Sequence, residues 1–185
     1  MLIRKATIED SYQIAQYLLM AMEDIVYEFI KKKDYNEAFN FLYHFVKLKN
    51  NQYSYQNCVV AEDDGEIIAA VNIYDGAKLE ELRSPIIAYL QENFGLDYMP
   101  ESETESGEYY IDTIAVSPRF RRKNIGTKLL QYLINKYVIN QKLTLGLLVE
   151  EDNLVAKNLY LKLGFKKVAE KSLVGNILNH LQIKG

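Results

Sequence analysis

The sequence has few of the features that mark a secreted or membrane-spanning protein. Its single cysteine, Cys58, excludes an intrachain disulfide and fits a reducing compartment. No apolar run approaches the roughly 18–20 residues that a membrane span needs, and residues 1–5 lack the apolar core of a signal peptide. We therefore expect a cytoplasmic protein in which Cys58 is a core residue.

Net charge and histidine are also scarce. The formal net charge is −3, which argues against a general nucleic-acid-binding protein. The two histidines, His44 and His180, lie in a Phe-rich helix and in the last expected strand, and we interpret both as structural. By contrast, 49% of the 185 residues are apolar. This is enough for a sizeable core, and the length suits one domain spanning residues 1–185.

The most informative stretch is residues 109–127, YYIDTIAVSPRFRRKNIGT. Its first half is β-branched and aromatic, which is typical of a strand. Pro118 cannot donate to a sheet ladder, so we expect the strand to end at Ser117. From Ile125 onward, apolar residues recur at three- and four-residue spacing, as in an amphipathic helix. Residues 119–124 are therefore predicted to form a short basic loop that leads into a helix N-terminus.

A loop of this kind suits the binding of phosphate groups. The first backbone amides of a helix have no partner within it, and the helix dipole is positive there. Gly126 lets the main chain approach a ligand closely, and Asn124 tolerates a left-handed conformation. A solvated basic turn has the same composition, so the loop alone leaves both interpretations open.

The stretch resembles motif A of the GCN5-related N-acetyltransferase (GNAT) superfamily. That motif is a hydrophobic strand, a Pro, and then (Gln/Arg)-x-x-Gly-x-(Gly/Ala) opening a helix. Arg121 lies at the Gln/Arg position and Gly126 at the last position. Two departures stand out, because Asn124 replaces the middle glycine and Arg122 occupies a position where many members carry another glycine.

A second block strengthens the resemblance. Residues 153–165, NLVAKNLYLKLGF, are similar to motif B of the same superfamily, Asn-x-x-Ala-x-x-Leu-Tyr-x-x-x-Gly-Phe. Two motifs in the right order, about a helix and a strand apart, are more specific than either one alone. The resemblance covers about residues 57–183 well, whereas the N-terminal third agrees more in layout than in motif.

The resemblance implies a mixed α/β (α+β) fold with a mostly antiparallel central sheet of about six to seven strands, flanked by helices and with splayed central strands. The residue patterns predict strands at 2–5, 58–62, 67–74, 109–117, 143–149, 165–171 and 173–183. They predict helices at 7–25, 23–32, 34–48, 79–94 (with a break or a start at Pro85), 125–138 and 153–164. Residues of about 7–50 form the variable helical segment, and residues of about 76–107 form an insertion.

Part of this insertion is strongly acidic. Residues 97–108 contain no Lys or Arg, and their acidic side chains are Asp97, Glu101, Glu103, Glu105 and Glu108. One interpretation is a solvated loop. The other is that the stretch borders a channel for the acceptor and attracts a cationic amine.

The chemistry that the resemblance implies is transfer of an acetyl group from acetyl-CoA, as co-substrate, to a primary amine of a small molecule, amino acid or peptide, by direct attack in a ternary complex and without a metal. Tyr160 lies at the position of the general acid that protonates the departing thiolate. The general base is Asp112, on the central strand, or Glu108, or is absent. The backbone amide of Val116 is the candidate for polarising the thioester carbonyl.

The resemblance also implies a set of cofactor contacts. These are Ile114, Ala115, Val116, Arg121, Arg122, Lys123, Asn124, Ile125, Gly126, Thr127, Asn153 and Tyr160. Asn153 also suits an ordinary helix N-cap.

Other functions stay open at this point. One is a non-catalytic regulator that binds acyl-CoA with the same fold. Another is nucleic-acid binding by the basic loop, which would depend steeply on salt. Transfer of a longer acyl group, or transfer to oxygen, is a variant of the enzymatic function. The acceptor has no recognisable motif, and a homodimer is an expectation because the superfamily often forms dimers.

Overall fold

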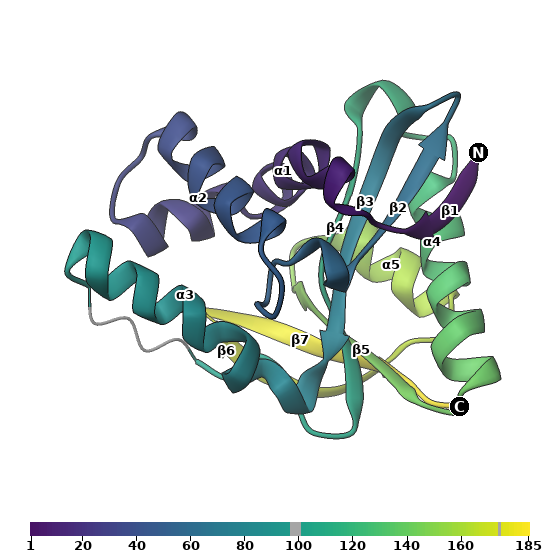
Figure 1. The fold of residues 1–185 in the computed structure, drawn as a ribbon. Helices are drawn as coiled ribbons and strands as arrows, with labels where there is room; N and C mark the ends of the chain where they lie inside the picture. Colours follow the sequence, from purple (N-terminus) through teal and green to yellow (C-terminus); the bar gives the residue numbers. More distant parts are fainter. Residues whose placement is uncertain (97–100, 174) are drawn as a thin grey trace.

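The computed structural model describes residues 1–96, 101–173 and 175–185. A seven-stranded sheet in the order β1-β2-β3-β4-β5-β7-β6 forms its centre (Figure 1). The strands are β1 (Leu2–Lys5), β2 (Cys58–Asp63), β3 (Glu66–Asp75), β4 (Glu108–Val116), β5 (Thr144–Glu150), β6 (Lys166–Leu173) and β7 (Asn176–Ile183). The pairing of β4 with β5 is parallel and the other pairings are antiparallel. The predicted fold class is confirmed.

The helices are α1 (Ser11–Ile30), α2 (Tyr35–Lys47), α3 (Leu79–Phe94), α4 (Ile125–Leu133) and α5 (Leu154–Lys162), with a π-helical turn, η5 (Ile134–Asn140), continuing α4. Short 3-10 turns occur at η1 (Ile8–Asp10), η2 (Tyr55–Asn57), η3 (Gly76–Lys78) and η4 (Pro118–Phe120).

Two helix predictions need correction. The expected helices at 7–25 and 23–32 are one element, α1, that follows a 3-10 turn and kinks at Met22, where φ is −137°. The expected break or start at Pro85 does not occur, because Pro85 lies inside α3. Proline cannot donate to the carbonyl four residues earlier. The Ser84 hydroxyl donates to that carbonyl, Glu81 O, at 3.1 Å, so α3 continues.

The local signals for turns and caps are confirmed. Asp64 and Gly65 both have positive φ, at 49° and 79°, as a tight β-hairpin requires. The Asp34 side chain caps α2 by accepting from the Glu37 amide at 3.0 Å. Gly95 ends α3 in the left-handed conformation, with φ of 64°.

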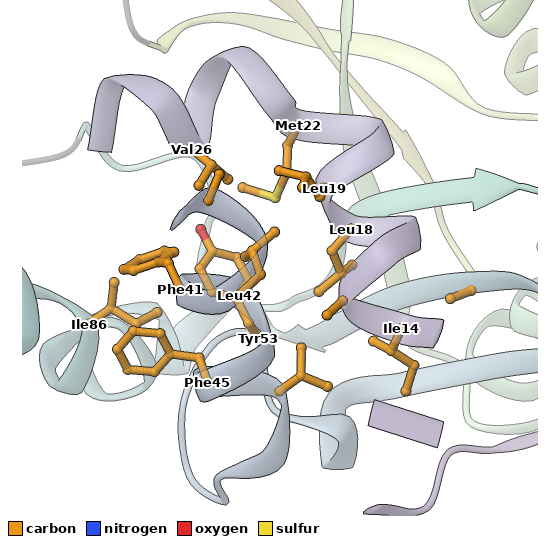
Figure 2. Close-up of a cluster of buried hydrophobic side chains, with 14 of the residues drawn as sticks. Ile14, Leu18, Leu19, Met22, Val26, Phe41, Leu42, Phe45, Tyr53 and Ile86 are labelled. Atoms are coloured by element: carbon orange, nitrogen blue, oxygen red, sulfur yellow. The ribbon is translucent and has the colours of Figure 1, made fainter. Parts of the chain in front are cut away.

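The sheet separates two hydrophobic clusters. The first cluster joins α1, α2 and α3 to the sheet, and Figure 2 shows its side chains from α1, α2 and α3 around Tyr53. The second cluster joins α4, η5 and α5 to the sheet. Successive β2 residues alternate between them, since Val60 belongs to the first and Val59 and Ala61 to the second. Cys58 is buried in the first cluster, as expected.

The central strands diverge in the middle of the sheet. Strands β4 and β5 pair only from Glu108 with Thr144 to Ile111 with Leu147. Beyond Ile111, β4 stays paired with β3 while β5 stays paired with β7, so a gap opens between β4 and β5. At the start of the gap the β3–β4 register shifts, and Asp112 is the extra residue of this β-bulge. The predicted splay therefore begins at the residue predicted as the base.

Candidate active site

The basic loop between β4 and α4 presents a row of backbone amides. Both residues that depart from the glycine pattern of motif A adopt the left-handed conformation, Arg122 with φ of 62° and Asn124 with φ of 59°. In the part of the chain that the structure describes, the amides of residues 122–127 donate to no protein acceptor, and the next amide, of Lys128, donates to the Asn124 carbonyl at 3.0 Å. The loop therefore keeps the geometry of an anion-binding site without two of the glycines.

Five of these six residues line a cavity of about 650 Å³, which we call the loop cavity. Its lining comes from α1, β4, the basic loop, α4 and α5. Every predicted cofactor contact lines this cavity except Lys123, whose ammonium group lies over the Phe120 ring, 4.8 Å from its centroid. A Cβ atom added at Gly126 would meet Val116 Cγ2 at 3.7 Å, an ordinary contact. Packing of the protein alone thus does not require glycine at position 126.

The gap between β4 and β5 exposes further backbone groups. The Ser117 amide donates to the Ile68 carbonyl of β3 at 2.9 Å. The backbone N–H and C=O groups of successive residues in a strand point to opposite sides. The backbone groups of Ile114 and Val116 therefore point away from β3 and into the gap. Consistent with this, the Arg121 Nε atom lies 3.5 Å from the Val116 carbonyl oxygen. The Val116 amide is therefore directed as the predicted carbonyl contact requires.

A second cavity, of about 240 Å³, lies deeper between α1 and the sheet. We call it the carboxylate cavity because Glu103 and Asp112 line it. It shares four lining residues with the loop cavity, which are Ala21, Asn153, Ala156 and Tyr160. The kink of α1 at Met22 lies here, since Ala21 lines both cavities and Met22 lines the second.

Tyr160 stands where the two cavities meet. Its side chain is 8% exposed, and burial raises the pKa of its hydroxyl to about 12. The phenol therefore keeps its proton at neutral pH, as a proton donor must. Asn153, about two turns before it, caps α5 through a 3.2 Å bond from the Ala156 amide to its Oδ1 atom. It combines the N-cap role with a place in both cavities.

Asp112 faces the carboxylate cavity from the bulge of β4. Its Oδ2 atom accepts a hydrogen bond from Gln52 Nε2 at 3.1 Å. Burial, together with the negative charge of nearby Glu103, raises the pKa of the Asp112 carboxyl to about 7. Near neutral pH this group can therefore both accept and release a proton.

Both carboxylate oxygens of Glu108, the alternative base, contact other groups of the protein. It is buried, and its Oε1 atom accepts from the Glu105 amide at 3.0 Å. Its Oε2 atom accepts from Gln182 Nε2 at 2.7 Å and lies 2.8 Å from Nε2 of His180, which is itself buried. Glu108 therefore does not offer the free carboxylate that a base needs, and His180 occupies a structural position.

The acidic stretch has two interpretations, as a solvated loop or as the border of an acceptor channel, and its residues do not all behave alike. Glu103 and Glu108 are buried, so the interpretation as a solvated loop is wrong for them. Glu101 and Glu105 are exposed. The Glu101 carboxylate accepts from Ser172 Oγ at 2.8 Å and the Glu105 carboxylate pairs with Lys171 at 3.2 Å. Asp97 lies outside the described residues. Only Glu103 of this group lines the carboxylate cavity within the described structure.

Gln52 and Arg83 also line this cavity, and the sequence analysis missed both. Gln52 lies in the polar segment 50–57, between the expected helix at 34–48 and the expected strand at 58–62, yet residues 51–54 are buried. Arg83 had a detectable signal. The buried residues of α3 are Leu79, Arg83, Ile86 and Leu90, so an arginine occupies the apolar stripe of a helix.

Two negative findings concern residues 1–96, 101–173 and 175–185 only. They contain no cluster of three or more histidine, cysteine or acidic side chains placed to hold a metal ion. Their helices include none with the length and apolar character of a membrane span.

Comparisons with known proteins agree with this geometry. The model of the acetyltransferase (GNAT) family matches residues 19–165. A crystal structure described as an acetyltransferase is 31% identical, with a TM-score of 0.82 over 100% of this chain and 99% of that chain. An N-acetyltransferase from Staphylococcus aureus Mu50 is 26% identical, with a TM-score of 0.83 over 99% of this chain and 100% of that chain.

A more distant structure has a similar fold. The paiA N-acetyltransferase from Thermoplasma acidophilum, in complex with coenzyme A, is 16% identical, with a TM-score of 0.59 over 100% of this chain and 98% of that chain. A search of curated proteins found no match. The chain belongs to the GNAT acetyltransferase family, and the match begins inside α1, well before the region of about 57–183 that the motifs indicated.

Proposed function

We propose that the protein is an acetyl-CoA-dependent N-acetyltransferase that acetylates a primary amine by direct attack in a ternary complex. The observation that carries the proposal is the junction of two cavities at Tyr160. A cavity lined by unpaired amides meets one lined by a carboxyl group that titrates near neutral pH, and a protonated phenol lies between them. Membership of the family supports acyl transfer, and two of the similar structures are described as N-acetyltransferases.

The loop cavity suits coenzyme A by its donor set. The amides of residues 122–127 and the side chains of Arg121 and Arg122 would hold the pyrophosphate. The backbone groups of Ile114 and Val116 in the gap between β4 and β5 would pair with the pantetheine arm. The similar fold from Thermoplasma acidophilum is described in complex with coenzyme A, which supports this use of the cavity.

Each protein group then has one task. Asp112 takes a proton from the ammonium form of the acceptor, so that nitrogen has a free electron pair. The Val116 amide stabilises the negative charge on the thioester oxygen as the C–N bond forms. Tyr160 donates its proton to sulfur as the C–S bond breaks. The acceptor nitrogen loses two protons in all: Asp112 takes the first, and the second leaves to solvent once the C–N bond has formed. The proton held by Asp112 then passes through solvent to the Tyr160 phenolate and restores the phenol. The products are an N-acetyl amine, the thiol form of CoA and one proton released to solvent.

Thermal unfolding with added ligand tests the cofactor part of the proposal. Acetyl-CoA at 100 times its dissociation constant should add about 2.7 kcal/mol to the stability of the native state, which raises Tm by roughly 5–10 °C for a chain of this size. CoA should act similarly and ATP should not. An unchanged Tm at millimolar acetyl-CoA would contradict the proposal.

Release of CoA with a panel of amines tests catalysis, and Tyr160→Phe is the matched variant. Loss of the proton donor should lower kcat by about 100-fold or more. Acetyl-CoA affinity should change little, because the ring and its packing against Phe165 remain. Equal turnover by the two proteins would remove Tyr160 from the mechanism. A saturable shift with acetyl-CoA but no CoA release with any amine would instead identify a regulator that binds without turnover.

A further inference from the structure

Arg83 is the one positively charged residue among the described residues that line the carboxylate cavity. Its guanidinium already binds other groups of the protein. Its Nη2 atom pairs with the Glu103 carboxylate. Its Nε atom donates to Gln52 Oε1 at 3.1 Å and its Nη1 atom donates to the Glu101 carbonyl at 3.1 Å. Three of the five N–H groups of the guanidinium are therefore engaged, at least one on each nitrogen. Because Glu103 already neutralises the charge of Arg83, a substrate carboxylate would have to share or displace this counter-ion.

The negative groups of the cavity are not balanced in the same way. Glu103 has its counter-ion in Arg83, but Asp112 has only the neutral amide of Gln52 as a hydrogen-bond donor. Gln52 fixes this arrangement, because its Nε2 atom lies 3.1 Å from oxygens of Tyr74, Glu103 and Asp112. When Asp112 is ionised, the cavity therefore carries an uncompensated negative charge.

A hollow next to the cavity also carries negative side chains. It has a volume of about 420 Å³ and shares Ile25, Glu150, Leu173 and Leu178 with the carboxylate cavity. It is lined further by Asp24 and by Glu28, which pairs with Lys31 on the exposed surface of α1. An anionic molecule would therefore meet like charge in the hollow as well as in the cavity.

Part of the wall is apolar. Met22, Ile25 and Phe29 contribute from α1, and Leu148 and Leu178 from β5 and β7. With a volume of about 240 Å³, the cavity suits the body of a small molecule with a few methyl or methylene groups next to its amine.

We infer that the acceptor is a compact cationic amine with an apolar body and no carboxylate, so that free amino acids are poor acceptors. This inference rests on the proposed function and narrows its acceptor class. The pairing of Arg83 with Glu103 carries the inference, because recognition of an amino acid would need a cation whose charge is free to bind the α-carboxylate.

Three acceptors with the same branched carbon body test it, namely isoamylamine, L-leucinamide and L-leucine. We expect kcat/KM for isoamylamine and for leucinamide to exceed that for leucine by about 100-fold or more, because burying an unpaired carboxylate is strongly unfavourable. Turnover of leucine within tenfold of leucinamide would overturn the inference, and so would failure of all three as acceptors. Failure of the proposed function is separate, since it would appear as an absent thermal shift with acetyl-CoA.

A variant should weaken the preference. Glu103→Gln removes the counter-ion of Arg83 and leaves its positive charge unpaired, so the ratio of leucine to leucinamide turnover should rise by about tenfold or more. The matched control is Glu105→Gln, two residues away on the surface, which should leave the ratio unchanged. An unchanged ratio in a folded Glu103→Gln protein would overturn the role of Arg83. If that variant does not fold, the comparison of the three acceptors with the wild-type enzyme still decides.

Discussion

Replacing Gly126 by Ala should affect the stability of the protein and its affinity for CoA in opposite directions. Gly126 is the second residue of α4, and an added Cβ atom would lie 3.7 Å from Val116 Cγ2 without a clash. Alanine in a helix is favoured over glycine by about 0.5–1 kcal/mol. For a chain of this length that corresponds to a Tm about 1–4 °C higher in the absence of ligand.

The same methyl group should weaken ligand binding. Gly126 lines the loop cavity, and its amide is one of those without a protein acceptor. A hydrogen bond to a charged group contributes about 1.5–3 kcal/mol. Losing one such contact to a phosphate oxygen would raise the dissociation constant of CoA by roughly 10- to 100-fold.

Isothermal titration with CoA and thermal unfolding without ligand measure the two effects. Asn158→Ala is the matched control, because Asn158 lies on the exposed face of α5 and its replacement adds helix propensity away from the loop. It should raise Tm slightly and leave CoA affinity unchanged. A Gly126→Ala protein that binds CoA as tightly as the wild type would refute the role of the loop amides, and a lower Tm would refute the local packing.

Two further substitutions test the site and the sheet. The kcat/KM of the wild type should rise with pH through about 7 as Asp112 ionises, and Asp112→Asn should remove this rise. Because the pKa of Asp112 is raised above its ordinary value of 3.8, the native state holds the proton more tightly than the unfolded chain, so the contribution of this group to stability falls between about pH 4 and pH 7. Urea unfolding should show that the free energy of unfolding of Asp112→Asn, relative to that of the wild type, is higher at pH 8 than at pH 5. The same difference between the two proteins at both pH values would contradict the shifted pKa. Gly146→Ala should lower the free energy of unfolding by about 2–3 kcal/mol, because its Cβ atom would lie 1.9 Å from Glu108 Oε2 and displace a carboxylate that bonds Gln182 and His180. A loss below about 0.5 kcal/mol, the range of neutral surface substitutions, would show that Glu108 has room to move.

Much of the fold could be predicted because its signals are local. The hairpin at Asp64-Gly65, the cap at Asp34 and the left-handed Gly95 each depend on a few adjacent residues. The kink of α1 at Met22 has no such signal. Neighbouring side chains at Leu18, Leu19 and Val26 continue the apolar pattern through it, and tertiary packing decides the bend.

In the candidate site too, residues in local motifs could be predicted, and residues joined by long-range contacts could not. Tyr160 and the loop residues could be located because they belong to two compact motifs. Gln52, by contrast, meets Glu103 and Asp112 across 51 and 60 positions of the chain. Contacts of such separation leave no periodic or spacing pattern. The burial of Glu103 could not be inferred either, because it depends on pairing with Arg83 of α3.

The separation of the two hydrophobic clusters has a consequence for how such an enzyme changes its substrate. The side chains behind the carboxylate cavity, among them Met22 and Tyr53, belong to the cluster that α1, α2 and α3 form on one face of the sheet. Those behind the loop cavity, including Ile125 and Leu130, belong to the cluster on the other face. Mutations at Met22 or Tyr53 therefore reshape the pocket for the amine and repack only the first core. Selection can alter the acceptor repeatedly while the machinery for the acetyl donor stays folded and functional.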